Sequence, residues 1–133
     1  MIIPAAENMG LREGDTGVHI PLACNANDKG SLFAGSIFSG ATLVAYRAAE
    51  RLFKSRGMAG DLVAKTATIN YLKRMVSDGF AQATPMSEPI LKPNGNYTVP
   101  MRVRVVDTDG ICGAELSAEF ILLQKKQANT RFR

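Results

Sequence analysis

The sequence predicts an α+β fold in which one long buried helix is wrapped by a curved antiparallel β-sheet. A stretch without proline runs from residue 31 to Gly57, and its first half is apolar on nearly all sides. Strand-like segments separated by turn residues follow this stretch, whereas no second long helical pattern does. Because such a helix must be covered on most sides, we expect the sheet to curl around it.

The length of 133 residues and the composition favour one globular domain over residues 1–133. With 46% hydrophobic and 21% charged residues, the chain is neither disordered nor fibrous in type. The net charge of +4 favours anionic partners in general. The sixteen Lys and Arg residues are scattered, however, and Trp is absent, so a nucleic-acid partner is not predicted.

The cysteines and the amino-terminal residues argue against several other classes. Cys24 and Cys112 are too few for a disulfide framework, and with the single His19 they do not supply a metal site. The sequence begins without a basic region followed by an apolar run, and no segment approaches the roughly 18 apolar residues of a membrane span. We therefore expect a cytoplasmic protein that needs no metal or cofactor and binds no membrane.

The segments before the helix are predicted to be short. Residues 1–14 are expected to form an irregular arm or a single helical turn. Residues 15–24 are rich in β-branched and apolar side chains, and Pro21 within them predicts a strand near a sheet edge. Residues 25–30, NANDKG, are turn formers and predict a loop that leads into the helix.

The helix is predicted to be buried in its first half and to end in water. Its first half carries the apolar residues Leu32, Phe33, Ile37, Phe38, Ala41, Leu43, Val44 and Ala45. A helix that is apolar all round is buried all round. Charged residues occur only in the second half, where Lys54 suits the negative end of the helix dipole. Gly57 is expected to close the helix.

Four strands are predicted after the helix, over residues 61–73, 79–85, 97–107 and 110–125. The turn signals SDG, KPNGN and DTDG separate them. In the third strand, apolar residues alternate with two arginines, which is the period of a half-buried strand. The polar residues 126–133 are expected to form a frayed tail.

A buried helix preceded by one strand and followed by an antiparallel meander predicts the hotdog fold. A sheet that covers one helix still leaves an edge strand and an apolar rim. We expect a second copy of the chain to cover both, which predicts a homodimer or a dimer of dimers.

The start of the helix and the loop before it are the best candidate for a site. Backbone NH groups in the first turn of a helix have no internal partner and stabilise an oxygen anion. Gly30 and Gly35 lack side chains, which would let a ligand carbonyl approach the backbone. The alternative is that Gly35 and Gly40 only allow the helix to pack closely against a strand.

Asp28 is the only carboxylate of this segment and the best candidate to activate or position a water molecule. Alternatively, Asp28 or Ser31 caps the helix. The other polar residues nearby are Asn25, Asn27, Ser36 and Ser39. A Ser-His-Asp triad is not predicted, because His19 lies in a strand-like segment and no serine has a G-x-S-x-G setting.

Three blocks of sequence resemble the hotdog acyl-CoA thioesterases, and within them the thioesterase branch of the YiiD C-terminal type. They are PLACNANDKGSLFAGSIFSGATL, ATINYLKRMVSDG and VRVVDTDGICGAELSAEFIL, and the resemblance covers about residues 9–124. It implies a hydrolase that acts on acyl-CoA. Coenzyme A would then be part of the substrate and not a cofactor.

The resemblance places the backbone NH groups of Gly35 and Ser36 opposite the thioester carbonyl. The branch pattern begins the helix with Phe-Gly-Gly-Ser, and Ala34 stands here in place of the first glycine. Broader thioesterase families carry His-Gly-Gly at this point and an acidic residue at the position of Thr42. Phe33 stands here instead of that histidine.

The missing histidine and acid argue against the hotdog dehydratases and change the implied mechanism. The role of positioning water passes to Asp28, to Asn27 or to a group of the other subunit. The pantetheine arm is implied to enter between two subunits, where Tyr71 of one faces the helix start of the other. The predicted substrate-binding residues are Asn25, Gly30, Phe33, Ser39, Thr42, Tyr71, Lys65, Lys73 and Arg74.

Three of these residues, Lys65, Lys73 and Arg74, are candidates to hold the phosphates, although solvated strand ends explain them equally well. The leading hypothesis is hydrolysis of an acyl-CoA or other acyl thioester by an oxyanion-stabilising helix start and a positioned water. The alternative is a non-catalytic acyl-thioester binding protein, favoured by the missing helix carboxylate. A third hypothesis is a structural partner domain without a ligand.

Overall fold

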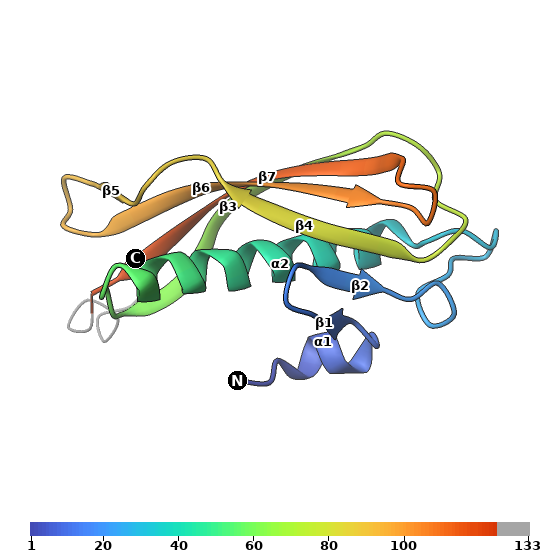
Figure 1. Cartoon of the computed structure of the whole chain (residues 1–133), viewed down its shortest axis with the longest axis horizontal. Helices are drawn as coiled ribbons and strands as arrows, with labels where there is room; N and C mark the ends of the chain where they lie inside the picture. Colours follow the sequence, from blue (N-terminus) through green and yellow to red (C-terminus); the bar gives the residue numbers. More distant parts are fainter. Residues whose placement is uncertain (125–133) are drawn as a thin grey trace.

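The computed structural model describes residues 1–124, so the predicted frayed tail at residues 126–133 lies outside the described residues. One long helix packs against the concave side of a seven-stranded sheet (Figure 1). The elements in chain order are α1 (Pro4–Asn8), β1 (Arg12–Glu13), β2 (Val18–Ile20), α2 (Ala34–Ser55), β3 (Asp61–Tyr71), β4 (Gly79–Pro85), β5 (Ile90–Leu91), β6 (Tyr97–Val106) and β7 (Cys112–Leu123). The predicted α+β class is confirmed.

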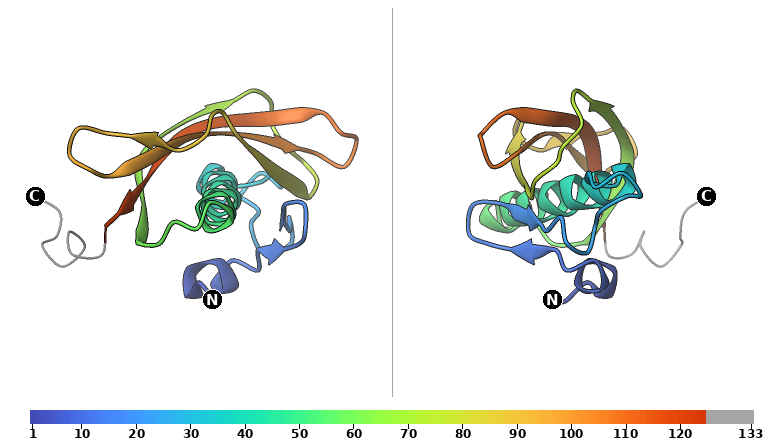
Figure 2. Two further views of the ribbon diagram at one scale, coloured as in Figure 1. Left: turned by 60° about the vertical axis from the view of Figure 1, so that its left-hand side comes forward. Right: turned by 90° about the vertical axis from the view of Figure 1, so that its right-hand side faces the viewer.

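The sheet is antiparallel in every pair and curves over α2 (Figure 2). Its order is β1-β2-β4-β6-β7-β3, with β5 paired to β6 outside this path. The long helix therefore lies beneath the middle of the sheet, and β3 returns to the edge opposite β1. The two edges of the sheet, β1 and β3, therefore lie far apart. The start of α2 lies near the end of β3 and the start of β4.

The inner side of the sheet supplies most of the core. Along β6, Val99, Met101, Val103 and Val105 are buried, while the arginines between them are exposed. This alternation confirms the predicted half-buried strand. In α2 the buried residues are Ser36, Ile37, Gly40, Ala41, Leu43, Val44, Ala45, Ala48, Ala49 and Phe53.

The prediction that the first half of α2 is buried all round is wrong in part. Phe38, Ser39, Thr42 and Tyr46 are only partly buried. They lie on the side of the helix where α1 and β3 leave space between them. The end of α2 agrees with the prediction, because Gly57 follows the helix with a left-handed φ of 68°.

The amino-terminal segment is more regular than the sequence predicted. Residues 4–8 form α1, in line with the alternative of one helical turn, but Arg12–Glu13 forms β1 and pairs with β2. As a result β2 is the second strand from the edge, which agrees with the prediction of a strand near a sheet edge over residues 15–24. The strand has three residues because Pro21, which has no NH to donate, follows it directly. The two-residue β5 was also not predicted.

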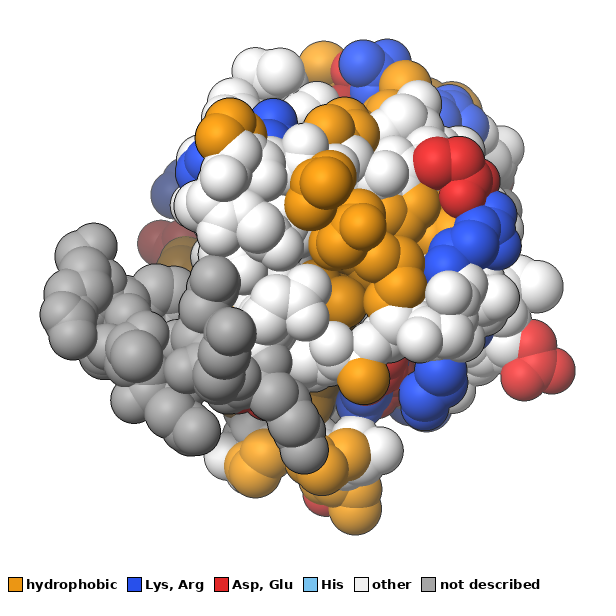
Figure 3. Space-filling model, turned by 90° about the vertical axis from the view of Figure 1, so that its left-hand side faces the viewer, with side chains coloured by type: hydrophobic (Ala, Val, Ile, Leu, Met, Phe, Trp, Pro, Cys, Tyr) orange, Lys and Arg blue, Asp and Glu red, His pale blue; other side chains and the backbone are white. Residues whose placement is uncertain are grey.

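Successive residues of β3 point to opposite faces of the sheet, and on both faces their side chains are exposed to solvent over the middle of the strand. Residues 64–68 are all exposed, and a register shift between Ala64 and Thr66 makes Lys65 the extra residue of a bulge. At the end of the molecule where α2 finishes and β5 lies, hydrophobic side chains gather in the centre of the face (Figure 3). Both features leave surface that the predicted second copy could cover.

Candidate functional site

The first turn of α2 presents two backbone NH groups without an acceptor. The helix begins at Ala34, and Phe33 before it has extended backbone angles and makes no side-chain cap. The NH of Ser36 donates to the carbonyl of Phe33 at 3.0 Å, so it is already used. The NH groups of Ala34 and Gly35 have no hydrogen bond to any of residues 1–124. The pair of free donors is therefore 34 and 35, one residue earlier than the predicted pair.

Gly35 and Gly40, the two glycines of α2, meet different neighbours at the place where a side chain would begin. A Cβ atom on Gly35 would lie 2.7 Å from the ring of Phe33, which folds back beside the helix start. A Cβ atom on Gly40 would lie 2.5 Å from Cδ1 of Ile20 in β2. Close packing against a strand thus explains Gly40. At Gly35 the absent side chain leaves room for the exposed Phe33 ring instead.

The two asparagines of the loop hold its backbone in place through side-chain hydrogen bonds. Asn25 is buried, and its side-chain NH₂ donates to the carbonyls of Met9 and Pro21 at 2.8 and 2.9 Å. The side-chain oxygen of Asn27 accepts from the backbone NH groups of Lys29 and Ser31 at 2.9 and 3.1 Å. These bonds form a tight polar turn. Gly30 lies within it with a left-handed φ of 77°.

Asp28 lies at the outside of this turn. Its side chain is 85% exposed, and one carboxylate oxygen is 3.5 Å from Nζ of Lys29. It lines neither of the pockets described below. The helix start has no side-chain cap, so the alternative that Asp28 or Ser31 caps α2 is wrong. In this subunit the Asp28 carboxylate points to solvent and not to the free NH groups.

A recess of about 380 Å³, lined by both polar and apolar residues, lies beside the helix start. The Tyr71 hydroxyl, at the end of β3, donates to the carbonyl of Ala34 at 2.9 Å. Partial burial raises the pKa of Tyr71 above its ordinary value, which keeps the hydroxyl protonated as a donor. The recess brings together Asn27, Lys29, Ala34, Tyr71, Lys73 and Arg74. Four of the predicted site residues therefore share one recess with a free NH group.

The three predicted phosphate-binding cations lie in two places. Lys73 pairs with Asp107 at 2.8 Å and, with backbone NH groups, holds the pKa of that carboxyl below its ordinary value. Arg74 donates to the carbonyl of Lys29 at 2.8 Å and so fixes the loop. Lys65 lines a separate recess on the outer side of the sheet, with Nζ 3.9 Å from Glu119. Only the first two lie beside the helix start.

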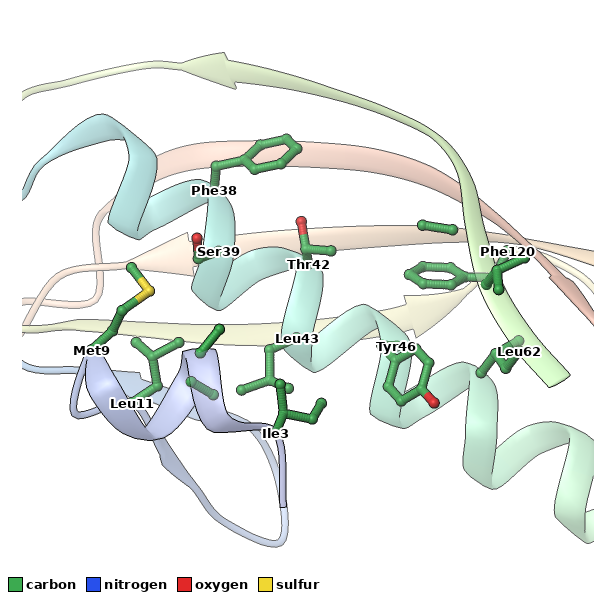
Figure 4. A pocket seen from close by; sticks show the side chains of 14 residues that line it. Ile3, Met9, Leu11, Phe38, Ser39, Thr42, Leu43, Tyr46, Leu62 and Phe120 are labelled. Atoms are coloured by element: carbon green, nitrogen blue, oxygen red, sulfur yellow. The ribbon is translucent and has the colours of Figure 1, made fainter. Parts of the chain in front are cut away.

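An apolar pocket of about 410 Å³ lies along α2, between α1 and β3 (Figure 4). Ser39 and Thr42, both predicted to bind substrate, line it. The sequence reasoning missed the contribution of α1 and the residues that flank it, which supply Ile3, Ala6 and Met9 to the lining. Their spacing of three residues is the signal that could have revealed an apolar side on this short helix.

Residues 1–124 contain neither a cluster of metal ligands nor a membrane-spanning helix. No group of three or more His, Cys, Asp or Glu side chains in this range could hold a metal ion. No helix in the same range is both long and apolar enough to cross a membrane.

Comparison with known proteins decides the family. The profile of the family described as putative thioesterase, YiiD C-terminal (YiiD_C), matches residues 2–124. The chain belongs to this family. The match confirms the resemblance inferred from the three sequence blocks. A search of curated proteins found no match.

YiiD_C membership agrees with the solved structures that this chain is similar to. A putative thioesterase from Shewanella oneidensis is 25% identical, with a TM-score of 0.75 over 91% of this chain and 88% of that chain. A thioesterase from Haemophilus influenzae is 16% identical, with a TM-score of 0.73 over 90% and 82%. A Bacillus halodurans protein solved with CoA is 16% identical, with a TM-score of 0.73 over 92% and 78%. These similarities confirm the hotdog fold.

Proposed function

We propose that this YiiD_C protein hydrolyses an acyl thioester of the coenzyme A type. The observation that carries the proposal is the pair of free NH groups at Ala34 and Gly35. Ala34 lines the recess beside the helix start, and the apolar pocket begins one helical turn further along α2, at Phe38 and Ser39. A thioester likewise joins a polar carrier to an apolar acyl chain. Family membership supports thioester hydrolysis as the reaction class.

The NH groups of Ala34 and Gly35 donate hydrogen bonds to the thioester carbonyl oxygen and stabilise the negative charge that forms on it during attack. A water oxygen bonds to the carbonyl carbon, the carbon–sulfur bond breaks, and the thiol leaves with one proton of that water. Neither pocket lining contains a carboxylate from the described residues. Catalysis by this subunit therefore relies on oxyanion stabilisation. The predicted water-positioning role of Asp28 requires a second subunit, because its carboxylate faces solvent.

Coenzyme A as the carrier has two supports. The Bacillus halodurans protein of the same fold was solved with CoA. In this chain, Lys29, Lys73 and Arg74 line the recess beside the helix start, where cations would attract the phosphates. Lys73 shares its charge with Asp107, and Lys29 shares its charge with Asp28, so Arg74 is the stronger contributor.

A homodimer remains our expectation for the assembly. The exposed edge of β3 offers unpaired backbone groups to a second copy of the chain. A partner at this edge would lie close to the apolar pocket, whose lining includes Leu62, Val63 and Ala64 of β3. A cytoplasmic location likewise stays a prediction.

The decisive experiment removes one oxyanion donor without disturbing the helix. Proline is well tolerated at the first position of a helix, and Ala34 occupies that position after a residue with extended backbone angles. Thiol release from a panel of acyl-CoAs should fall by about 10²–10³ in kcat in Ala34→Pro. Ala34→Ser keeps the NH group and serves as the matched control.

The outcomes separate the proposal from its alternative. Turnover by the wild type and by Ala34→Ser, with loss in Ala34→Pro, supports hydrolysis at this helix start. Saturable binding of acyl-CoA without turnover in the wild type would instead favour the non-catalytic binding protein. Equal activity of Ala34→Pro and Ala34→Ser would exclude the Ala34 NH group from the mechanism.

A further inference from the structure

Two pockets lie end to end between α2 and β3, and three residues line both of them. The apolar pocket of about 410 Å³ lies toward the start of α2, and a second pocket of about 660 Å³ lies toward its end. The residues common to the two linings are Tyr46, Leu62 and Val63. These three residues therefore form the partition between the pockets.

One side of α2 runs along both pockets. Its lining residues follow one another at spacings of three and four, which places them on the same side of the helix. They are Ser39, Thr42, Tyr46, Glu50 and Phe53, of which the first three line the apolar pocket and the last three the second pocket. Figure 4 shows Tyr46 and Leu62 toward one end of the apolar pocket. An acyl chain that runs along this side from Ser39 would therefore meet the Tyr46 ring at that end.

The Tyr46 ring is held in place by its neighbours. Its centroid lies 6.1 Å from that of the Phe120 ring, with the two planes tilted at 60°, which is a favourable aromatic arrangement. The guanidinium carbon of Arg47 lies 5.8 Å from the same centroid, and Arg47 pairs with Glu13 of β1 at 2.8 Å. Tyr46 is only partly buried, so a ligand in either pocket can touch it.

The helix sets the distance from the free NH groups to this ring. The Cα atom of Tyr46 lies about 16 Å beyond that of Gly35 at the rise of an α-helix. An extended chain advances about 1.2 Å per bond, as the three backbone bonds of an extended residue do. Side chains of a helix lean toward its amino terminus, which brings the ring nearer than its Cα atom. A chain of about ten to twelve carbons therefore spans the distance from the thioester carbonyl to the Tyr46 ring.

We infer that the apolar pocket holds the acyl chain and that Tyr46 limits this chain to about ten to twelve carbons by closing the pocket toward its larger neighbour. This inference rests on the proposed thioester function and specifies its substrate class. No charged side chain of the described residues lines the apolar pocket, which suits a chain of methylene groups. The second pocket offers apolar surface from Phe53, Met58 and Leu122 together with three charged residues. A longer chain could therefore enter it once the partition is open.

The test measures kcat/KM for saturated acyl-CoAs of increasing length, each below the concentration at which it forms micelles. In the wild type kcat/KM should be highest near ten to twelve carbons and fall about tenfold or more when about four carbons are added, because these must displace a held ring. Tyr46→Ala opens the partition. Its optimum should move up by about four to eight carbons, since the second pocket follows α2 from Tyr46 to Phe53, over about 10 Å.

Three further variants control this test. Tyr46→Phe keeps the ring without its hydroxyl and should keep the wild-type limit. Leu62→Ala removes a different part of the partition, so it should shift the limit in the same direction even if Tyr46→Ala fails to fold. Tyr97→Ala is the matched control, because it removes another partly buried tyrosine that lines neither pocket.

Two results would overturn the inference. One is a wild type that hydrolyses chains about four carbons beyond the expected limit as fast as those at the limit. The other is a limit that stays unchanged in Leu62→Ala and in a folded Tyr46→Ala, or that shifts equally in Tyr97→Ala.

A binding measurement distinguishes this inference from the proposed reaction. Non-hydrolysable thioether analogues of the same acyl-CoAs are titrated by calorimetry into the wild type and the variants. Each buried CH₂ group should improve Kd by about two- to fourfold until the chain reaches Tyr46. A limit of this kind that moves in Tyr46→Ala supports the inference even if no thiol is released, in which case only hydrolysis fails. Binding without any length limit overturns the inference while leaving the hydrolytic function open to its own test.

Discussion

The Tyr71 hydroxyl of β3 donates a hydrogen bond to the carbonyl of Ala34, and so ties the end of the edge strand to the first residue of α2. We expect Tyr71→Phe to lower kcat/KM for an acyl-CoA by about three- to tenfold, because one neutral hydrogen bond that positions Ala34 is lost. The melting temperature should change little, since Tyr71 is about half exposed.

Tyr97→Phe is the control for this prediction. The Tyr97 hydroxyl has no hydrogen bond to another described residue, and the residue lies in β6 away from the helix start. Steady-state kinetics of both variants should show a loss for Tyr71→Phe only. Unchanged kinetics in Tyr71→Phe would mean that the loop positions Ala34 without help from β3.

Asp78 gives the stability of the fold a dependence on acid pH. One carboxylate oxygen accepts from the backbone NH of Leu22 at 2.8 Å, and the other lies 2.9 Å from Nε2 of His19. The Leu22 bond first, and the His19 contact second, lower the pKa of Asp78 in the folded state. A lowered folded pKa stabilises the fold above the unfolded pKa and loses this contribution as pH falls through the folded pKa.

We expect the wild type to have a higher unfolding free energy than Asp78→Asn at neutral pH. This difference should narrow as the pH falls below about 4, which is the ordinary pKa of aspartate. Urea unfolding at a series of pH values measures it. Asp15→Asn, in an exposed bend, is the control and should show no such gap. A gap that stays constant between neutral and acid pH would contradict the assignment to the Asp78 charge.

Much of the fold follows from short-range pattern in the sequence. Residues 79–85 form a strand as predicted, and Gly57 ends the helix, because turn residues and periodicity act locally. The two-residue strands β1 and β5 have no such pattern. They exist because β2 and β6 supply partners, and a pairing of this kind is invisible until the chain has folded.

The site was predicted as a region but not as a set of contacts. The free NH groups at the helix start follow from helix geometry alone, yet the helix begins with Ala34, which moves the donors by one residue. Asp28 had the right chemistry in the right loop. The hydrogen bonds that Asn27 makes within the turn leave the Asp28 side chain pointing into solvent. No local sequence pattern encodes this direction.

The chemistry of Asp28 suggests that replacing it would lower turnover, whereas its exposure predicts almost no effect. A fully solvated surface carboxylate contributes within about 0.5 kcal/mol, or about twofold in rate, when it is replaced. Asp28→Asn should therefore keep kcat/KM within about twofold of the wild type in an acyl-CoA assay. A loss of more than about tenfold would place Asp28 in the site of a second subunit, and dilution across the dimer dissociation range would then abolish activity.

The glycines of α2 should respond to alanine in opposite ways. In Gly40→Ala the new Cβ meets the fully buried Ile20, which cannot move away, so we expect a loss of about 1–3 kcal/mol in unfolding free energy. In Gly35→Ala the new Cβ meets the ring of Phe33, which is 56% exposed and can swing into solvent. Stability should then hold or rise slightly, because alanine favours the helix.

Gly35→Ala should lose activity although it keeps its stability, whereas Gly40→Ala should lose stability although it keeps its activity. The displaced Phe33 ring and the added methyl group both crowd the Gly35 NH, so kcat should fall in Gly35→Ala. In Gly40→Ala the folded fraction should keep its kcat, because residue 40 packs against β2 and lines neither pocket. Urea unfolding combined with thiol release measures both effects. A Gly35→Ala variant with full activity would show that the helix start tolerates a side chain beside the oxyanion.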